Sequence, residues 1–562
     1  MQFLNHPHHD GSDLYVSGKQ VWVRVPADFA AETPWLRCVV DGEPRFVAMT
    51  VDPARTGRAI GGHGATDTWW TAVLPAHNPV TPYRFRFGGQ WLTAAGLVSH
   101  DIPDTTDFRL VAYDAPPSWM QDAIIYEIFP DRFAGSLTGK ALPDWALPAQ
   151  WDTDPVIGEG PGVSEQFYGG DLDGIVAHLD HIQSLGVNTI YLTPIFPARS
   201  NHRYDASTFD GVDPLLGGDI ALKRLSDAVQ ARGMRLIGDI TTNHVGAAHE
   251  WFASFPEMFY WLEDGDYESW CGVKSLPKLN WNSALVWDRM TSVLQRWLEY
   301  FHGWRVDVAN MTGRFRSDDL THSVAASLRR ALPAEAMLVA EHNHDAGGDL
   351  DRDGWHGTMN YGGFLRPVWC WLRGEDVSLD NFLGMPGNIP SRDGLSTLDT
   401  IRAFSSRMSW RSYVHSWQLL DSHDAARIRT VTGSFESHLV ALGLQAALPG
   451  TPMVFAGSEF GLTGSNGEHS RTPMPWNRPA DRSEETLAAY RELIGLRAKE
   501  NALRHGGLRW IHADADSLVF LRETEAESIV VSASRTGNAL PVPFATTPLY
   551  SSSGLKIGRV AC

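Results

Sequence analysis

The sequence has few cysteines, lacks long apolar runs and carries no excess of basic residues. Only four of its 562 residues are cysteine, and their spacing matches neither a metal-binding motif nor a disulfide framework. Its apolar runs stay shorter than a membrane-spanning helix requires. Lys and Arg number 47 against 66 Asp and Glu, a net charge of −19, which would repel the phosphates of nucleic acid. We therefore expect no membrane span and no nucleic-acid partner.

The N-terminal residues and the cysteines favour a cytoplasmic protein. The first ten residues, MQFLNHPHHD, lack the basic segment and the apolar stretch that form a secretory signal peptide. The scattered cysteines Cys38, Cys271, Cys370 and Cys562 suit a reducing compartment, in which thiols stay unpaired.

Both ends of the chain are predicted to be β domains. Alternation of apolar and polar residues in Val21-Trp-Val-Arg-Val25 and in 83–87 predicts an N-terminal β-sandwich over residues 1–115. Short strand patterns such as Ser517-Leu-Val-Phe-Leu521 predict a C-terminal β-sandwich domain over residues 500–562. A length of 562 residues is also too great for a single core.

The middle of the chain, residues 116–499, alternates short apolar strands with amphipathic helical stretches. Eight such units indicate an α/β fold, a (β/α)8 barrel of the TIM type. An aromatic-rich stretch at about 246–285 reads as a small insertion after the third strand. The eight predicted strands begin at Ile124, Thr189, Arg235, Trp304, Met337, Thr358, Trp417 and Pro452.

Carboxylates follow several of these strands directly. Asp307, Glu341 and Asp424 each come at or just after the end of a predicted strand. In a parallel barrel the carboxyl ends of all strands converge on one face, which carries the catalytic residues. A single carboxylate at a strand end is more often a salt bridge or a cap, but three in one barrel favour a shared catalytic pocket.

Such a trio suits the cleavage of a glycosidic bond, which needs an acid for the leaving oxygen and an anion facing the sugar carbon. Arg305 shares a strand face with Asp307 and would hold that carboxylate ionised. Glu341 follows an apolar strand, where partial desolvation favours the protonated form of an acid/base. Asp424 would accept hydrogen bonds from sugar hydroxyls. The 22 tryptophans also favour a carbohydrate ligand.

Residues 120–480 resemble the α-amylase family of glycoside hydrolases. The matching motifs are Asp239-Ile-Thr-Thr-Asn-His244, Gly303-Trp-Arg-Val-Asp307, Ala340-Glu341 and Ser422-His-Asp424. The resemblance implies that Asp307 is the nucleophile, Glu341 the acid/base and Asp424 the transition-state stabiliser. A retaining reaction would place the Asp307 and Glu341 carboxyl groups about 5–5.5 Å apart. Six further residues match substrate-binding positions of the family: Tyr204, His244, Arg305, His423, Arg471 and Trp476.

Within that family, Leu276-Pro-Lys-Leu-Asn280 resembles a segment of neopullulanases, cyclomaltodextrinases and maltogenic amylases. Such enzymes also have an N-terminal β-sandwich, which in many of them closes the active site of a partner subunit. The resemblance therefore implies a homodimer through the N-terminal domain.

Three residues depart from the pattern of this subgroup. Met311 stands where glutamate is usual, and His342 and Asn343 stand where an apolar residue and a tryptophan are usual. We expect Lys278, His342 and Asn343 to border the acceptor side of the cut. Two new hydrogen-bonding groups there favour short or cyclic α-gluco-oligosaccharides with α-1,4 or α-1,6 links, such as cyclic maltosyl-maltose.

Two alternative functions remain open. A transglycosylase shares every catalytic residue with a hydrolase. A non-catalytic carbohydrate-binding relative usually lacks one of the three carboxylates, and all three are present here.

We expect no required cofactor and assign no metal ligands, but calcium stays an open possibility. Gly169-Gly-Asp171 matches part of the calcium segment of relatives, whereas residues 131–139 lack most of it. The acidic loop that begins at Asp349 resembles a calcium-binding loop, yet its twelfth position is Asn360 instead of glutamate.

Overall fold

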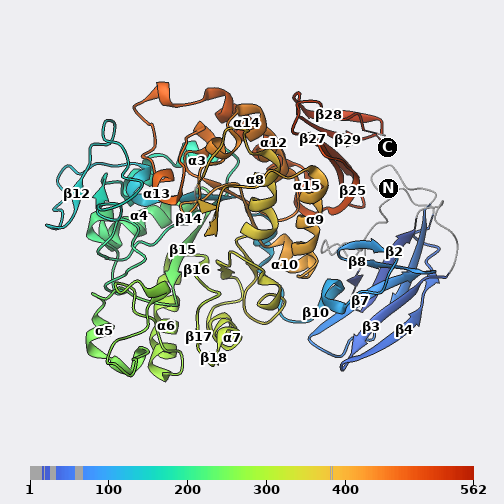
Figure 1. Cartoon of the computed structure of the whole chain (residues 1–562), viewed down its shortest axis with the longest axis horizontal. Coiled ribbons are helices and arrows are strands. Elements are labelled where there is room, and N and C mark those ends of the chain that lie inside the picture. The colour runs from blue at the N-terminus through green and yellow to red at the C-terminus, as the bar shows by residue number, and fades with distance from the viewer. Residues whose placement is uncertain are drawn as a thin grey trace.

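The computed structural model consists of a central barrel flanked by β-sheets at both ends of the chain (Figure 1). It describes residues 16, 17, 19–25, 33–56, 67–379, 381, 382, 384–542 and 544–561. The first ten residues, on which the expectation about a signal peptide depends, lie outside this part of the chain, as does Cys562.

Eight parallel strands form the central sheet, in the order β20-β19-β16-β15-β14-β11-β24-β23. Their bounds are β11 (Ile125–Ile128), β14 (Thr189–Leu192), β15 (Arg235–Thr241), β16 (Gly303–Asp307), β19 (Met337–Ala340), β20 (Gly357–Thr358), β23 (Trp417–Leu419) and β24 (Thr451–Phe455). A parallel bridge between Met359 and Trp417 joins the two outermost strands. The sheet therefore closes, and the predicted (β/α)8 barrel is confirmed.

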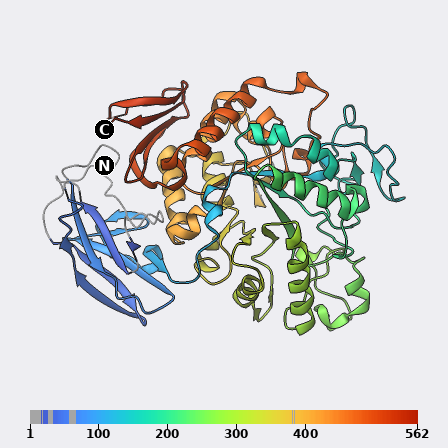
Figure 2. The same ribbon diagram turned by 180° about the vertical axis from the view of Figure 1, so that it is seen from behind.

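Helices surround this barrel (Figures 1 and 2). The longer ones are α4 (Gly218–Ala231), α6 (Ala284–Arg296), α7 (Thr321–Ala331), α8 (Arg366–Leu372), α9 (Gly394–Ser405), α12 (Phe435–Ala447) and α14 (Glu484–Lys499). The shorter ones are α1 (Pro130–Phe133), α2 (Leu172–Ala177), α3 (Leu179–Ser184), α5 (Glu250–Ser254), α10 (Trp410–Val414), α11 (Ile428–Thr432), α13 (Gly467–Ser470) and α15 (Asn501–His505).

Helix α14 shows how the sequence sets such boundaries. The Ser483 hydroxyl caps its first turn by accepting a hydrogen bond from the Thr486 amide. Glu484 and Glu485 lie in the first turn and Lys499 in the last, so their charges complement the helix dipole.

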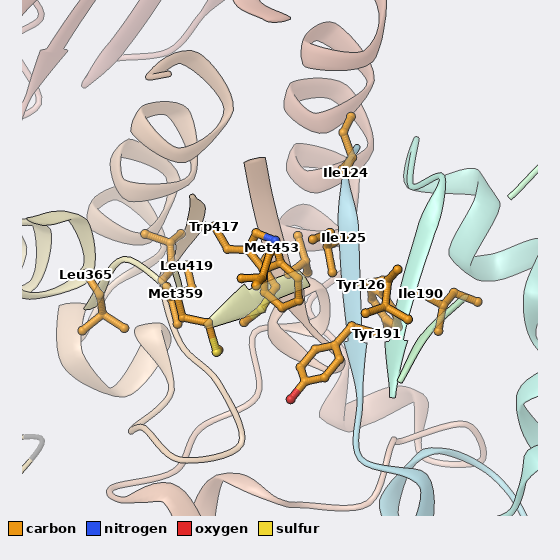
Figure 3. Close-up of a cluster of buried hydrophobic side chains, with 14 of the residues drawn as sticks. Ile124, Ile125, Tyr126, Ile190, Tyr191, Met359, Leu365, Trp417, Leu419 and Met453 are labelled. Atoms are coloured by element: carbon orange, nitrogen blue, oxygen red, sulfur yellow. The ribbon is translucent and has the colours of Figure 1, made fainter. Parts of the chain in front are cut away.

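Apolar and aromatic side chains fill the barrel interior. Figure 3 shows residues of β11, β14, β23 and β24 gathered in one buried cluster. The rings of Tyr191 on β14 and Trp417 on β23 lie 5.3 Å apart, although two other strands separate β14 from β23 in the sheet. The centre is thus packed, and a ligand must bind at the strand ends.

The N-terminal part is a β-sandwich. One sheet has the order β1-β2-β6-β5, and the other has the order β4-β3-β7-β8-β9 with β10 paired to β7. Val21 and Val23 from the first sheet pack with Leu36, Tyr83 and Phe85 from the second. The strands are β1 (Val16–Ser17), β2 (Gln20–Val25), β3 (Trp35–Val40), β4 (Glu43–Ala48), β5 (Thr50–Val51), β6 (Thr68–Val73), β7 (Val80–Phe87), β8 (Gln90–Thr93), β9 (Gly96–Val98) and β10 (Phe108–Val111).

The C-terminal part differs from the expected sandwich, because its described strands form one antiparallel sheet of order β25-β26-β27-β29-β28. A barrel helix takes the place of a second sheet. A Cβ atom at Gly443 of α12 would overlap the Leu555 side chain, so this glycine lets sheet and helix approach closely. The strands are β25 (Gly507–Ala513), β26 (Ser517–Glu523), β27 (Ser528–Ser534), β28 (Thr546–Ser551) and β29 (Leu555–Val560).

The two flanking β regions also contact each other. Both views show the C-terminal sheet beside the N-terminal sandwich (Figures 1 and 2). The buried Arg24 of β2 lies 3.2 Å from Glu523 of β26 and 3.4 Å from Asp67. Such a buried ion pair fixes the relative position of the two regions, because separating them would leave each buried charge without its partner, which costs free energy.

The excursion after the third strand is present between β15 and β16. It contains α5 and an aromatic cluster in which the Phe252 ring lies 4.9 Å from Phe259 and 4.8 Å from Tyr267. A bridge between His244 and Lys278 ties its two ends together. No helix within the described ranges combines the length and apolarity that crossing a membrane demands.

Candidate active site

A cavity of about 770 Å³ opens where the barrel strands end. It lies over the carboxyl ends of β15, β16, β19 and β23, the place at which a barrel of this kind collects its functional residues. The residues that line it include Tyr204, His244, Trp270, Asp307, Val308, Glu341, Asn343, Asp424, Glu468 and Arg471. Asp307, Glu341 and Asp424, predicted from separate strand ends, are therefore brought together.

The fully buried guanidinium of Arg305 lies between three carboxylates. Its Nη1 nitrogen is 2.7 Å from Asp307 Oδ1 and 3.1 Å from Asp239 Oδ1. Its Nη2 nitrogen is 3.1 Å from Glu341 Oε2. Asp307 and Glu341 thus lie at the two terminal nitrogens of one rigid, planar group, which fixes their positions relative to each other.

The electrostatics of Asp307 differ from the expectation that Arg305 simply holds it ionised. Burial and the neighbouring Glu341 carboxylate raise the pKa of Asp307 well above its usual range, and Arg305 acts in the opposite direction. Three carboxylates face one guanidinium, so a full set of ionised groups would leave uncompensated negative charge. The pKa of Asp307 is therefore set by burial and Glu341 acting against Arg305.

Asp424 is held in the ionised form by two cations. Its Oδ2 is 3.0 Å from His423 Nε2, and its Oδ1 accepts a hydrogen bond from Arg471 Nη2 at 3.1 Å. Burial acts to raise the pKa of Asp424, but His423 and Arg471 outweigh it and hold that pKa far below the usual range.

The His423 imidazole lies between two carboxylates. Its Nδ1 contacts Glu127 on β11 and its Nε2 faces Asp424. Burial lowers the pKa of His423, yet the two carboxylates dominate and raise it to about 10. This histidine is therefore an imidazolium at neutral pH.

Tyr204 connects this histidine to the arginine cluster. Its hydroxyl donates to Asp239 Oδ2 at 2.8 Å and lies 2.7 Å from His423 Nε2. Its ring stacks on the His423 ring with an interplanar angle of 14°. Tyr191 also donates to Asp239 at 2.5 Å, so two phenols and one guanidinium position this carboxylate.

Val308, directly after Asp307, has a strained backbone. Its φ angle is +37°, a region that β-branched residues rarely enter. In this conformation its amide donates a hydrogen bond of 2.8 Å to Glu341 Oε2. Backbone strain of this kind concentrates at functional sites, where surrounding contacts maintain it.

His244 lines the cavity, but Lys278 lies behind it. The Nε2 atom of His244 is buried and has no hydrogen-bond partner among the described residues, and burial lowers its pKa to about 3. The Lys278 ammonium donates to Asn243 Oδ1 and, at 3.0 Å, to the Met311 carbonyl. Burial lowers the pKa of Lys278 to about 8. Lys278 joins two strand-end loops and does not line the cavity.

The two residues after Glu341 point in different directions. Asn343 lines the cavity, and its buried Oδ1 has no hydrogen-bond partner within the described ranges. His342 turns away from the cavity, and its Nε2 lies 3.0 Å from Asp349 Oδ2. Of the two, only Asn343 lines the cavity, and its place on the acceptor side stays a prediction.

Of Arg471 and Trp476, only Arg471 lies at the cavity. Arg471 lines the cavity, and it donates to Glu468 at 2.6 Å and to the His423 carbonyl at 2.9 Å. Trp476 does not line the cavity, because its ring stacks on His178 at 4.1 Å. The structure thus gives Trp476 a packing position in the shell of the barrel.

Several residues of the site were missed from sequence. Trp270, on the insertion, lines the cavity. The only sequence feature that could have predicted this is the aromatic richness of residues 246–285. Glu127 is a charged residue inside an apolar strand and is fully buried, which signals a polar role. Glu468 had no signal beyond its helical spacing from Arg471.

In the two segments compared with the calcium site of relatives, the aspartates contact cationic side chains and backbone amides of the protein. Asp171 caps α2 and lies 2.8 Å from the Lys140 ammonium. Asp131 pairs with Arg132 at 2.8 Å and accepts from the Gly169 amide at 3.0 Å. Across the described residues, no group of three or more His, Cys, Asp or Glu is arranged to hold a metal ion.

Glu127→Gln tests the charge on His423. In the unfolded chain this histidine has an ordinary pKa near 6.5, so the native imidazolium stabilises the fold fully below pH ~6.5. That stabilisation is lost as pH rises towards the native pKa of about 10. We expect Glu127→Gln to lower the thermal midpoint at pH 6 and to make its decline between pH 6 and 10 shallower.

The matched control is Asp514→Asn, which changes the exposed pair of Asp514 and His512, 2.8 Å apart. The thermal midpoints of this variant should run parallel to those of the wild type across the same pH range. A Glu127→Gln curve that is also parallel would contradict the proposed charge.

Comparison with known proteins gives a consistent result. The catalytic-domain model of the α-amylase family matches residues 127–271. A cyclomaltodextrinase from a Bacillus species is 30% identical over 505 residues, which are 83% of this chain and 83% of the relative. Neopullulanase 2 from Thermoactinomyces vulgaris is 30% identical over 450 residues, 75% of this chain and 70% of that protein.

Solved structures agree with these relatives. The ligand-free cyclic α-maltosyl-(1→6)-maltose hydrolase from Arthrobacter globiformis superposes with a TM-score of 0.67 and 27% identity, covering 80% of this chain and 100% of that one. The sequence likeness extends over most of both chains, and the three carboxylates of the family motifs lie together at the barrel strand ends. The chain therefore belongs to the α-amylase family of glycoside hydrolases.

Proposed function

We propose that the protein hydrolyses α-glucosidic bonds, α-1,4 or α-1,6, in short or cyclic α-gluco-oligosaccharides and retains the anomeric configuration. Asp307 is the nucleophile, Glu341 the acid/base and Asp424 the transition-state stabiliser. The observation that carries this proposal is the placement of Asp307 and Glu341 at the two terminal nitrogens of Arg305, inside one cavity.

The distances to Arg305 favour this division of roles. Arg305 Nη1 lies 2.7 Å from Asp307 and Nη2 lies 3.1 Å from Glu341, so the guanidinium stabilises negative charge more strongly on Asp307, as a nucleophile requires. Glu341, acting as the acid, donates a proton to the leaving oxygen while Asp307 attacks the anomeric carbon. Glu341 then takes a proton from water, which displaces Asp307 and restores the free enzyme.

Asp424 supplies a fixed negative charge beside the reacting ring. The His423 imidazolium and Arg471 hold it ionised, so it accepts hydrogen bonds from sugar hydroxyls without changing its own protonation. A charge that is already oriented needs no reorganisation in the transition state.

Cavity size and unpaired polar groups support a small substrate. About 770 Å³ lies in the range of sites that enclose small molecules. The buried atoms His244 Nε2 and Asn343 Oδ1, without partners in the described structure, would bind sugar hydroxyls. Substrates that lack the matching hydroxyl would leave these atoms desolvated and unpaired, which strengthens discrimination. Relatives whose names include cyclomaltodextrinase and cyclic α-maltosyl-(1→6)-maltose hydrolase are consistent with this class.

Azide rescue separates the two catalytic roles. Glu341→Ala and Asp307→Ala are assayed with maltosyl α-fluoride, because fluoride leaves without protonation. With Glu341→Ala, azide should attack the glycosyl-enzyme and give an azide of retained configuration. With Asp307→Ala, azide should replace the nucleophile and give the inverted azide. Without azide, Glu341→Ala should lose about 10²–10⁴-fold on maltotriose.

The configuration of the azide products is read by NMR. Inverted products from the wild-type enzyme, or identical azide products from both variants, would rule out the assigned roles.

Asn343→Trp tests the specificity proposal. Maltotriose, cyclodextrins, pullulan, panose and cyclic saccharides with mixed links are ranked by kcat/KM, and the wild type should prefer the small or cyclic substrates. Trp replaces an amide with a stacking face, so the variant should shift towards linear maltodextrins. Asn343→Ala is the control that removes the amide without adding an aromatic ring. An unaltered substrate ranking in the tryptophan variant would contradict the specificity proposal.

A separate experiment distinguishes hydrolysis from transglycosylation, by identifying the products that the wild-type enzyme forms at high substrate concentration.

We also propose a homodimer through the N-terminal sandwich. Trp35 and Phe46 are 42% and 50% exposed on one sheet, and the Phe46 ring lies 6.4 Å from Trp91. Sedimentation should show a dimer that Phe46→Asp dissociates. The control is Val73→Asp, at a 58% exposed position of the other sheet, which should leave the dimer intact. A wild-type monomer would refute the interface.

A cytoplasmic location is proposed as well. Cys38 and Cys370 are buried thiols and Cys271 is an exposed one, all three unpaired. Free thiols of this kind persist in a reducing compartment.

A further inference from the structure

Asp349 lies outside the cavity, yet both of its carboxylate oxygens hold loops that carry catalytic residues. Its side chain is buried, 7% exposed. Oδ2 lies 3.0 Å from His342 Nε2, and Oδ1 accepts a hydrogen bond of 3.0 Å from Arg314 Nη2. His322 is the third neighbouring group, at 3.7 Å.

The first of these contacts acts directly behind Glu341. His342 is the next residue in the chain, and its ring is turned away from the cavity by the contact with Asp349. A fixed ring at position 342 limits rotation of the backbone that leaves Glu341. A histidine at this position can make this contact, whereas an apolar residue cannot.

The second contact acts on the loop that leaves Asp307. Arg314 also donates a hydrogen bond of 2.7 Å to the Asn310 carbonyl. That loop begins at Val308, whose φ of +37° is strained and whose amide donates to Glu341 Oε2 at 2.8 Å. A strained backbone relaxes unless its surroundings hold it, and the bridge from Asp349 through Arg314 to Asn310 is such a restraint.

A further tether anchors the same segment from the other side. Arg314 begins the hairpin of β17 (Arg314–Phe315) and β18 (Asp318–Asp319). The Asp318 carboxylate accepts hydrogen bonds from Tyr260 at 3.1 Å and Asn282 at 2.7 Å. The hairpin is thus held by the insertion at one end and by Asp349 at the other.

We propose that Asp349 is a positioning residue for the acid/base: through His342 and Arg314 it keeps the Val308 amide against the Glu341 carboxyl group. This inference rests on the proposed role of Glu341. Burial acts to raise the pKa of Asp349, but His342 and Arg314 outweigh it and keep the pKa below its usual value, so the restraint is a charged one at neutral pH. Such charge-assisted hydrogen bonds are about twice as strong as neutral ones.

The dependence of rate on the leaving group tests this proposal. Asp349→Asn is assayed with maltotriose, whose sugar leaving group needs protonation, and with maltosyl α-fluoride, whose fluoride does not. We expect kcat/KM on maltotriose to fall about 10–100-fold, since a displacement near 1 Å costs about 10². On the fluoride, kcat/KM should change less than about threefold, because it reports only the steps up to loss of fluoride, which needs no proton from Glu341.

Asp319→Asn is the matched control. Asp319 is the other partner of Arg314, at 3.1 Å, but its side chain is 63% exposed. This variant should keep wild-type kcat/KM on both substrates. Arg314→Lys, which keeps the charge and loses the forked geometry, should repeat the pattern of Asp349→Asn and provides a second variant if the first does not fold.

Glu341→Gln separates failure of this inference from failure of the proposed function. This variant should lose more activity on maltotriose than on the fluoride, by a larger margin than Asp349→Asn does. If Glu341→Gln shows no such difference between the two substrates, the assigned acid/base role is wrong. If Glu341→Gln shows the difference but Asp349→Asn and Arg314→Lys lose equally on both substrates, or lose nothing, the positioning role of Asp349 is wrong.

Discussion

The site depends on one buried guanidinium. Arg305 is fully buried, and removing such a charge from water is costly unless carboxylates compensate for it. Asp239, Asp307 and Glu341 provide this compensation from three neighbouring strands. In the parallel pairing of β15 with β16, Asp239 lies opposite Arg305 and Thr241 opposite Asp307. Strand register therefore sets where Asp239, Arg305 and Asp307 lie relative to one another, and a one-residue shift would move every side chain to the opposite face.

Around this centre, neighbouring groups set the charges of His423 and Asp424. Glu127 and Asp424 make His423 an imidazolium, and this imidazolium in turn keeps Asp424 ionised. Tyr204 joins that pair to Asp239. Removing one member therefore alters the protonation of the others, which is the general behaviour of buried polar networks. The packed barrel interior beneath them restricts movement of the strands that carry them.

The cavity is lined by different parts of the fold. Barrel strands supply the carboxylates, the insertion supplies the aromatic side chain of Trp270, and Asn343 supplies an amide oxygen that has no partner in the described part of the chain. Loops tolerate change more readily than buried strands do, so the substrate range of such a site can vary while its chemistry is conserved. Asp349 lies at the junction of the two, because it restrains both the acid/base loop and the hairpin after Asp307.

The amino-acid sequence by itself determined the barrel, its eight strands, the carboxylates at the strand ends and the family, because periodicity, strand-end residues and motif order are local features of the chain. Only the tertiary structure decided that Trp476 packs on His178, that His342 turns to Asp349, that Lys278 lies behind the cavity and that a helix replaces a second C-terminal sheet. The physical reason is that a side chain's direction depends on partners distant in sequence, such as Glu127 and His423, 296 residues apart, which no local pattern records.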